Sequence, residues 1–573
     1  VCSSDLGNYV MKRFCILIVT CGMVLMSCRD LDLSPLSMAS DGNWFSDEAQ
    51  FEMSVNDLYR INVWNQLPDD WTDDEVYRNT LSAYALGSVT GQTWEVTDMW
   101  SNSYKVIGRD NTIIEKLNSS AADVLSPAKR ERFLGECLFV RACMYSQLIT
   151  LFGDVPYANE VVDIEKAFTM GRTPKEEVVK NVYADFDEAI RILPVESGAL
   201  QRPTRGAALA MKARFALYLE DWDKVIESTK ACMDLGVYEL YPSYEELFLS
   251  TTHNSSESVF SLARSIVDEV TISWTGALPR NHGGWGGRVP TWELLAAYLC
   301  TDGLPIDESP LFDPHNPFVN RDPRCTATIV PFGSTFLGFE YDPNPVTGEM
   351  VMNYKTGREQ KNNDNKAVTP HASYNALIYK KGMDETCIQN GNNTEHDLLI
   401  MRYADVLLMY AEAMIEKGTI DDSVLKAINQ VRARAYGKAV EDVANYPAVT
   451  ITDQNKLRTI LRTERRMEFA RENRRYMDMV RWRLCDKVLN LKSYGIFQNK
   501  DDIVGKMITP GYWFWAIAPD IDENGCADFS KLEEMGAINA LAQRTFDPRQ
   551  YLWPIPTKEI LINKNLEPQN PGY

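Results

Sequence analysis

Large aromatic side chains gather on two stretches without helical or strand periodicity. The first stretch contains Trp64, Trp71, Tyr77, Tyr84 and Trp94, and the second contains Trp274, His282, Trp285, Arg288 and Trp292. Trp and Tyr rings offer flat apolar surface that loses little rotamer entropy on binding, and Arg, Asn or Asp side chains add planar polar groups. Together these residue types suit the apolar C–H face and the hydroxyl groups of a sugar ring. The alternative is that the rings belong to the core.

Residue patterns typical of catalysis or metal binding are missing. The chain contains no HExxH, GxSxG, P-loop or dinucleotide fingerprint, and its cysteines form no CxxC pair and no Cys/His cluster with metal spacing. Its 80 acidic residues identify no particular carboxylate pair for glycoside hydrolysis. The tract from Asn362 to Asn365 suits either a calcium site with oxygen ligands or a solvated loop. We therefore expect a binding protein rather than an enzyme, with no cofactor.

The amino-acid composition limits the kinds of partner that the protein is expected to bind. The 573 residues are 45% hydrophobic, which allows one large domain or two or three ordinary ones. A net charge of −21 argues against nucleic acid or an anionic membrane surface as a partner. In the run 464–483 arginines alternate with acidic residues, which predicts a helix laced with salt bridges. Arg402 and Asp405 are expected to form a buried ion pair.

The N-terminal part reads as a targeting segment. Residues 1–10 look foreign to the protein, and residues 11–27, starting at Met11, have the basic and apolar regions of a signal peptide. The sequence LMSC that ends at Cys28 resembles the lipobox of bacterial lipoproteins. We expect lipidation of Cys28 and a membrane anchor. The alternative is an ordinary signal peptide with an incidental cysteine.

Paired helices organise the C-terminal third. A helix starting at Leu398 is apolar on nearly every side, which predicts burial, and Gly418 ends it. A second helix is expected over 421–436, and two more within 452–482. Helices joined by short turns are typical of stacked helical hairpins.

The N-terminal half repeats this organisation. One helix ends at Phe152 before Gly153, and others are expected over 175–193, 204–220 and 224–235. The helix expected over 204–220 is rich in alanine, and its A-x-x-A-x-x-A spacing resembles a tetratricopeptide repeat. We expect a mainly α fold with about four helical hairpins.

Three segments follow Cys28: a helical part over 28–237, a loop-rich insert over 238–397 and a second helical part over 398–573. The insert contains short strand-like runs, Gly/Pro turns and polar tracts. It has too many large aromatics for a disordered linker, so we expect ordered loops mounted on the helices. The three segments are expected to form one compact unit.

With these landmarks placed, the chain resembles the SusD/RagB family of outer-membrane nutrient-binding lipoproteins. Besides the lipobox, the resemblance rests on the stretches ECLFVRACMYSQLITLFGDVPY, RYADVLLMYAEAM, ERRMEFARENRRYMDMVRW and WPIPTKEILINKNLEPQNPGY. It implies a right-handed superhelical array of four tetratricopeptide-like helical pairs that supports a variable loop region with the ligand site. It also implies an outer-membrane lipoprotein facing the cell exterior. Such a protein delivers oligosaccharide, or peptide in some members, to a SusC-like TonB-dependent barrel transporter.

The resemblance also narrows the candidate ligand residues. Family ligand contacts cluster in the loop before the second helix and in the mid-chain insert, which here indicates Trp71, Trp94, Trp274, Trp285 and Arg288. Two alternatives stay open. One is a peptide-binding member of the same family, and the other is a non-binding helical scaffold in which the loop tryptophans are core.

Overall fold

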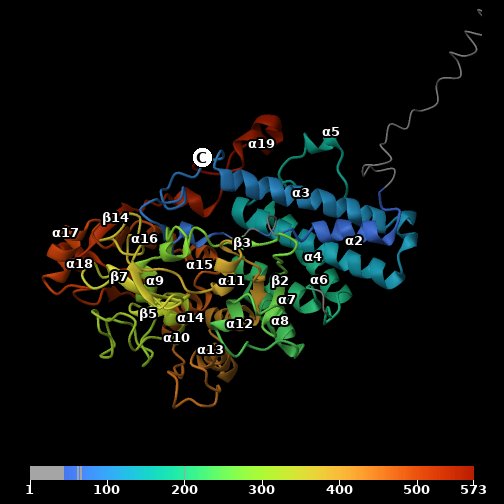
Figure 1. Ribbon diagram of the computed structural model, residues 1–573. Coiled ribbons are helices and arrows are strands. Elements are labelled where there is room, and N and C mark those ends of the chain that lie inside the picture. The colour runs from blue at the N-terminus through green and yellow to red at the C-terminus, as the bar shows by residue number, and fades with distance from the viewer. Residues whose placement is uncertain (1–43, 61–63, 65–66, 199–200) are drawn as a thin grey trace, which may run out of the picture.

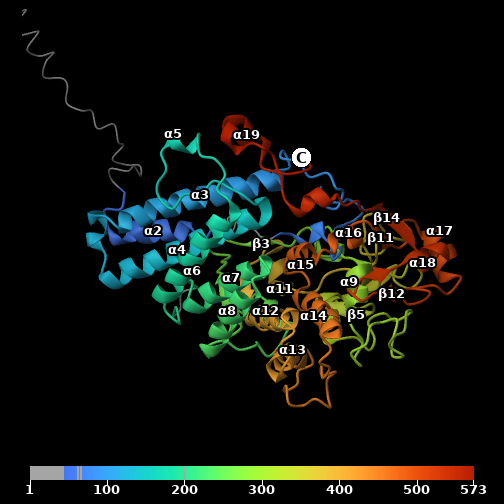
Figure 2. The same ribbon diagram turned by 180° about the vertical axis from the view of Figure 1, so that it is seen from behind.

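The computed structural model describes residues 44–573 apart from 61–63, 65–66 and 199–200. Residues 1–10 and 11–27, expected to be a foreign leader and a signal peptide, and Cys28 therefore lie outside the described residues. Most helices lie on one side of the molecule, and most short strands lie on the other (Figures 1 and 2). Within the described residues, no helix is both long and apolar enough to cross a bilayer.

Successive helices pack against one another along the helical side. Its first part consists of α2 (Glu48–Asp57), α3 (Trp94–Leu117), α4 (Pro127–Phe152), α5 (Ile164–Ala167), α6 (Lys175–Ile192), α7 (Arg205–Tyr218) and α8 (Trp222–Asp234). The C-terminal part adds α12 (Tyr403–Glu416), α13 (Asp422–Ala435), α14 (Gln454–Phe469) and α15 (Arg475–Arg481). Helix α4 packs between α3 and α6, and α12 packs between α8 and α13. The mainly helical fold predicted from the sequence is confirmed.

Local chemistry explains where these helices begin and end. The Ser126 hydroxyl accepts a hydrogen bond from the backbone N–H of Lys129 at the start of α4. The Thr204 hydroxyl caps α7 in the same way. Gly153, with a φ of 76°, ends α4, and Gly418, with a φ of 69°, follows α12. These signals are local, so the sequence placed most boundaries within a few residues.

The start of the helix predicted from Leu398 is wrong. Residues Leu398–Arg402 form strand β10, which pairs antiparallel with β2 (Ser258–Leu262), and α12 begins only at Tyr403. A short apolar run fits a buried strand as well as a buried helix turn. Pairing with β2, which lies far away in the sequence, makes this run a strand.

Short antiparallel strands and brief helices build the other side. The strands are β1 (Glu75–Tyr77), β3 (Ile272–Ser273), β4 (Arg288–Pro290), β5 (Ser334–Phe336), β6 (Phe339–Tyr341), β7 (Met350–Asn353), β8 (Arg358–Lys361), β9 (Asn393–Thr394), β11 (Lys492–Gly495), β12 (Asp520–Ile521), β13 (Ala527–Asp528) and β14 (Asn539–Gln543). The helices are α9 (Trp292–Ala297), α10 (Pro323–Thr328), α11 (Glu385–Gln389), α16 (Cys485–Val488), α17 (Lys500–Ile503), α18 (Ser530–Glu534) and α19 (Thr557–Ile562). Strands β5 to β8 form one four-stranded sheet, and β1–β4, β3–β9, β11–β14 and β12–β13 pair separately.

The polar tract at residues 362–365 is not the solvated loop that was one of the two alternatives for it. Asn362 and Asn365 are fully buried. The Asn362 amide donates hydrogen bonds of 2.8 Å to the carbonyl oxygens of Asp342 and Gly348, and Asn365 donates to that of Asn344. The tract therefore ties a neighbouring turn to the sheet. No group of three or more His, Cys, Asp or Glu side chains suited to a metal occurs in the described part of the chain.

One apolar core joins the two ends of the chain. The Trp71 ring stacks on Tyr84 with ring centres 4.3 Å apart, and both rings contact Tyr476 and Trp553. The Trp553 indole N–H donates a 2.9 Å hydrogen bond to the Tyr476 hydroxyl. The described residues before 238 and those from 398 onward thus share one buried core cluster.

A buried ionic network connects the helical side to the insert. Arg402 donates to Glu257 at 2.7 Å, to Glu468 at 2.6 Å and to Glu472 at 2.7 Å. All four side chains are almost completely buried. The acidic residues of the run 464–483 are therefore paired, as expected, but mainly with arginines from other elements.

The expected ion pair between Arg402 and Asp405 does not form. Asp405 instead pairs with Arg214 at 2.7 Å and with Arg465 at 2.9 Å. The expectation assumed that both residues share one helix. Arg402 ends strand β10, so helical spacing does not bring it to Asp405.

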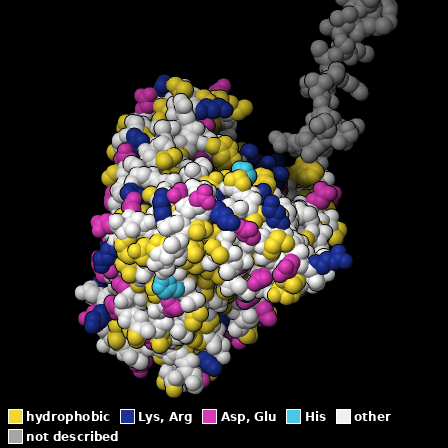
Figure 3. Space-filling view, turned by 60° about the vertical axis from the view of Figure 1, so that its left-hand side comes forward, with side chains coloured by type: hydrophobic (Ala, Val, Ile, Leu, Met, Phe, Trp, Pro, Cys, Tyr) yellow, Lys and Arg dark blue, Asp and Glu magenta, His cyan; other side chains and the backbone are white. Residues whose placement is uncertain are grey.

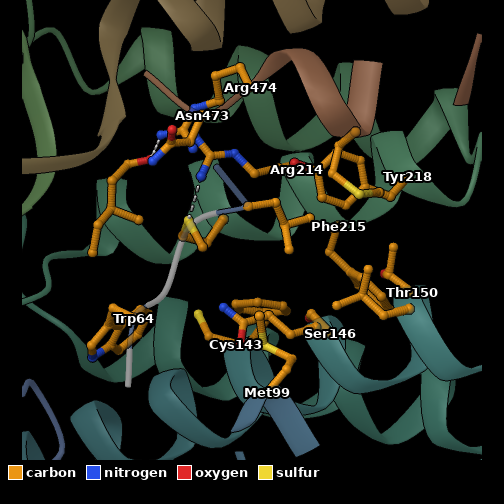
Figure 4. Close-up of a pocket in the computed structure, with 17 residues that line it drawn as sticks. Trp64, Met99, Cys143, Ser146, Thr150, Arg214, Phe215, Tyr218, Asn473 and Arg474 are labelled. Atoms are coloured by element: carbon orange, nitrogen blue, oxygen red, sulfur yellow. Dashed lines mark hydrogen bonds between the residues drawn. The ribbon is translucent and has the colours of Figure 1, made fainter. Parts of the chain in front are cut away.

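A cavity of about 100 Å³ lies within the helical side. Figure 4 shows Met99, Cys143 and Phe215 around it, with Arg214 at its edge. Arg214 is bonded to Asp405, so its charge is already balanced by the network. We regard this cavity as a packing gap in the scaffold.

The surface mixes charges of both signs. On the face shown in Figure 3, basic and acidic side chains alternate with small apolar patches. This face carries no extended field of one sign.

Candidate functional site

Trp285 is presented to solvent by a firmly held loop. Its side chain is 53% exposed. Its backbone N–H donates to the carbonyl oxygen of Thr275 at 2.8 Å, and its own carbonyl oxygen accepts from Arg78 at 3.4 Å and Arg280 at 3.3 Å. The exposed ring therefore rests on a backbone that is fixed before any ligand arrives.

The glycines around Trp285 are required by close contacts. A Cβ at Gly284 would lie 2.0 Å from the carbonyl oxygen of Leu278, and one at Gly287 would lie 2.7 Å from the ring of Tyr77. Gly283 adopts a φ of 84°, which glycine tolerates best. Turn geometry and tight packing thus explain the glycine-rich sequence, and together they fix the position of Trp285.

Arg288 lies beside this loop because β4 pairs with β1, which places Arg288 opposite Tyr77. Its guanidinium bonds Glu75 at 2.7 Å and Asp70 at 3.1 Å, while 45% of its side chain stays exposed. Burial acts to lower the pKa of Arg288, but Glu75 and Asp70 outweigh it and raise that pKa. Arg288 therefore stays charged, with exposed surface left for a ligand.

Two residues of this face were not among the ligand residues expected from the sequence, although Tyr77 belongs to the first aromatic stretch. Tyr77 packs against Gly287, and Arg78 lies over the Tyr77 ring with its guanidinium carbon 5.2 Å from the ring centre. The aromatic content of residues 64–96 was the available signal. It could not single them out, because their position depends on pairing with a strand some two hundred residues further along.

Trp274 lies in the same loop but has no free ring face. The Arg471 guanidinium carbon lies 4.2 Å from the centre of the ring, and the His396 ring stacks on it with centres 5.4 Å apart. Its indole N–H is buried and has no hydrogen-bond partner in the described part of the chain. Trp274 can therefore donate a hydrogen bond but cannot act as a stacking platform.

The other two candidate tryptophans, Trp71 and Trp94, contact other parts of the molecule. Trp71 is 3% exposed, and its ring faces are covered by the aromatic core, so no ligand can reach it in this conformation. Trp94 is 69% exposed at the start of α3. The preceding turn is held by a 2.8 Å hydrogen bond between the Gly91 carbonyl oxygen and the N–H of Thr557 in α19.

Comparison with known proteins identifies the class of this chain. The sequence model of the SusD family matches residues 250–573, and a model described as "Starch-binding associating with outer membrane" matches residues 32–217. The first covers more than half of the chain, so the protein belongs to the SusD/RagB family.

Individual relatives agree with this assignment. SusD-like protein P2 of Formosa agariphila is 23% identical over 98% of this chain and 100% of its own length. A SusD-like carbohydrate-binding protein of Bacteroides fragilis has 26% identity and a TM-score of 0.74, covering 91% of this chain and 99% of its own. Surface glycan-binding protein A of Bacteroides fluxus shares the fold, with 18% identity and a TM-score of 0.59 over 92% of this chain and 100% of its own.

Proposed function

We propose that the protein binds an oligosaccharide or polysaccharide at the face formed by Trp285, Tyr77, Arg78 and Arg288. The exposed Trp285 ring, carried on a backbone held by hydrogen bonds, supports this proposal, because an aromatic platform binds the C–H face of a sugar with little loss of entropy. The Arg78 and Arg288 guanidinium groups lie beside it as hydrogen-bond donors. Membership of the SusD/RagB family and the glycan-binding descriptions of two structural relatives support the same conclusion.

The proposed role is capture without chemical change. The carboxylates of Asp70 and Glu75 both bind Arg288 and serve to hold it. The Asp364 carboxylate, beside Gly286, accepts from the backbone N–H groups of Arg280 and Asn281 and so holds the loop. Incubating the protein with a bound polymer should therefore leave the chain length of the polymer unchanged. Shortened products in chromatography of the digest would assign it hydrolytic activity instead.

We further propose that the protein acts at the outer membrane, anchored through Cys28, and delivers its ligand to a SusC-like TonB-dependent transporter. The family assignment and the outer-membrane description of the matching N-terminal model support this. In this proposal, residues 28–237 and 398–573 form the helical support. The insert over 238–397 supplies Trp285 and Arg288 of the ligand face, and residues 28–237 supply Tyr77 and Arg78.

Native gels containing single polysaccharides test the binding proposal. The protein from residue 29 onward should be retarded by at least one of a panel of host, plant and microbial polymers. Trp285→Ala should remove the retardation while the melting temperature is unchanged, since the ring is half exposed. The matched control is Trp94→Ala, which removes another exposed tryptophan and should leave retardation intact.

The outcomes separate the three interpretations. If peptides but no polysaccharide bind in isothermal titration, the protein is a peptide-binding member of the family. If Trp285→Ala unfolds the protein instead of sparing the fold, Trp285 is structural and the scaffold interpretation holds. Retardation lost only in Trp94→Ala would move the ligand site to the start of α3.

A further inference from the structure

A second, more polar cavity lies beside the Trp285 loop. It has a volume of about 120 Å³ and is lined by Trp274, Arg264, His396 and Arg471 among others. The residue after Trp274 accepts the hydrogen bond from the Trp285 backbone, so the cavity and the platform share one loop. At 10–15 Å³ per water position, this volume holds several waters or one polar substituent of a sugar.

Two arginines at this cavity lack an acidic partner. Arg264 is 8% exposed, and its Nη1 donates to the carbonyl oxygen of His396 at 3.2 Å. Arg471 lies between the rings of Trp274 and Tyr379 and donates to the carbonyl oxygen of Lys381 at 3.1 Å. Neither forms an ion pair with any residue that the structure describes. Buried arginines without a counter-charge are unusual because desolvation is costly.

The neighbouring carboxylates are bonded elsewhere. Asp397 accepts from His253 at 3.0 Å and from the backbone N–H of Asn254 at 2.8 Å. Glu472 is held by Arg402 and by Lys381, the latter at 2.6 Å. Both carboxylates line the cavity and offset part of its positive charge, but neither forms an ion pair with Arg264 or Arg471.

Several buried polar atoms at the cavity have no hydrogen-bond partner in the described part of the chain. They are Nε of Arg264, Nε1 of Trp274, Nδ1 of His396 and Oγ of Ser255. The first two are donors, and the last two can donate in a suitable tautomer or rotamer. Unpaired donors of this kind, converging on one cavity, are satisfied by an oxyanion.

The pKa values agree with positive charge that Asp397 compensates only in part. Burial lowers the pKa of Arg264 to about 10. Burial, together with the charges of Arg264 and Arg471, lowers the pKa of His396 to about 3. An anion in the cavity would stabilise all three cationic forms.

We infer that this cavity is a subsite for the oxyanion of an acidic sugar, either a uronate carboxylate or a sulfate ester. The inference rests on the proposed function, and it adds that the natural glycan is acidic. The sugar ring that carries the anion would lie next to the ring stacked on Trp285. The net negative charge of the protein opposes such a ligand only weakly, because repulsion beyond about 8 Å is screened at physiological ionic strength.

Isothermal titration with matched oligosaccharides tests this subsite. The probes are oligogalacturonate, its methyl ester, a sulfated galactan oligomer and a neutral galactan oligomer of the same length. Wild-type protein should bind at least one acidic oligomer at least tenfold more tightly than its uncharged counterpart. Preference for oligogalacturonate indicates a carboxylate, and preference for the sulfated oligomer indicates a sulfate ester.

Three variants locate the effect. Arg264→Gln should remove the preference for the acidic oligomer. Trp274→Phe removes the indole donor while keeping the ring between Arg471 and His396, and it should weaken acidic binding several-fold. Arg60→Gln removes an exposed positive charge on the chain next to α2 and should change nothing, which controls for general electrostatics. Melting temperatures establish that each variant is folded.

The results distinguish this subsite from the binding proposal itself. Equal affinity for charged and uncharged oligomers, or acidic binding unaffected by Arg264→Gln in a folded protein, overturns the subsite. The same holds if no acidic oligomer binds, whatever the neutral polymers do. Neutral binding that depends on Trp285 would then leave the proposed function standing alone.

Discussion

At the residue scale, the position of Trp285 depends on glycines that leave no room for a side chain. Gly284→Ala would place a methyl group 2.0 Å from a backbone carbonyl oxygen, so the loop must move. We expect Gly284→Ala to weaken glycan binding at least tenfold and to lower the free energy of unfolding by about 1–3 kcal/mol.

The matched control is Gly108→Ala in helix α3, where a Cβ meets nothing within 4 Å. Alanine favours the helix by about 0.5–1 kcal/mol over glycine, so this variant should be as stable or more stable and should bind normally. Chemical denaturation and native gels measure both variants. Normal binding by Gly284→Ala would show that the loop is not held as tightly as described.

His396 should make stability depend on pH. Its pKa is about 3 in the folded protein against 6.5 for an ordinary histidine, because burial and two arginines disfavour its charge. Below pH 6.5 the unfolded chain gains a proton that the folded protein does not, so stability falls as the pH falls. Between pH 6.5 and pH 5 this amounts to about 2 kcal/mol.

Urea denaturation of wild type and His396→Gln at both pH values isolates this contribution. The variant should lose less stability on acidification than the wild type by about that amount. Asp364, whose pKa burial raises to about 6, acts in the opposite direction but is common to both proteins. Identical pH dependence would contradict the described surroundings of His396.

Which residues form the site could be predicted only in part. Trp285 and Arg288 are exposed, as polar and glycine-rich surroundings indicated, although Arg288 lies in strand β4, and their contact with a ligand stays a prediction. The sequence could not predict that Trp71 and Trp274 are covered by other side chains, because those side chains come from distant segments. Tyr77 meets Arg288 only through the β1–β4 pair.

At the scale of elements, the buried ionic network holds β10, α13 and α14 together. Glu468 is fully buried and bonds Arg402 at 2.6 Å and Arg324 at 2.9 Å. Burial acts to raise the pKa of Glu468, but the surrounding arginines outweigh it and hold that pKa far below its usual range. The network therefore needs the negative charge of Glu468.

We expect Glu468→Ala to destabilise the protein by about 3–5 kcal/mol, because it leaves several guanidinium groups buried without a partner. The control is Glu131→Ala, which removes an exposed partner of Arg191 at 3.8 Å and should cost less than about 1 kcal/mol. Thermal and chemical denaturation compare the two variants. Similar small losses would mean that the arginines find other partners.

Helices were the most predictable elements. The capping residues and the apolar face that define a helix lie close together in the sequence, as Ser126 and Gly153 do at the two ends of α4. Strand β10 was not predictable in this way, since its identity depends on β2. The same dependence on remote partners explains the incorrect pairing expected for Arg402.

At the scale of the whole molecule, the core shared by Trp71 and Trp553 predicts that the N-terminal half cannot fold alone. A fragment ending at residue 237 would expose the rings that Trp553 and Tyr476 cover. We expect it to lack near-ultraviolet circular dichroism and a cooperative melting transition. A cooperative transition in the fragment would show that residues 28–237 are an independent domain.

Glycan binding at the Trp285 face is best tested by an affinity gel that compares wild type, Trp285→Ala and Trp94→Ala. We expect retardation of wild type and Trp94→Ala by the same polysaccharide, and unretarded migration of folded Trp285→Ala. Retardation of all three proteins alike would contradict this expectation, because binding would then not depend on the one exposed ring that the loop holds in place.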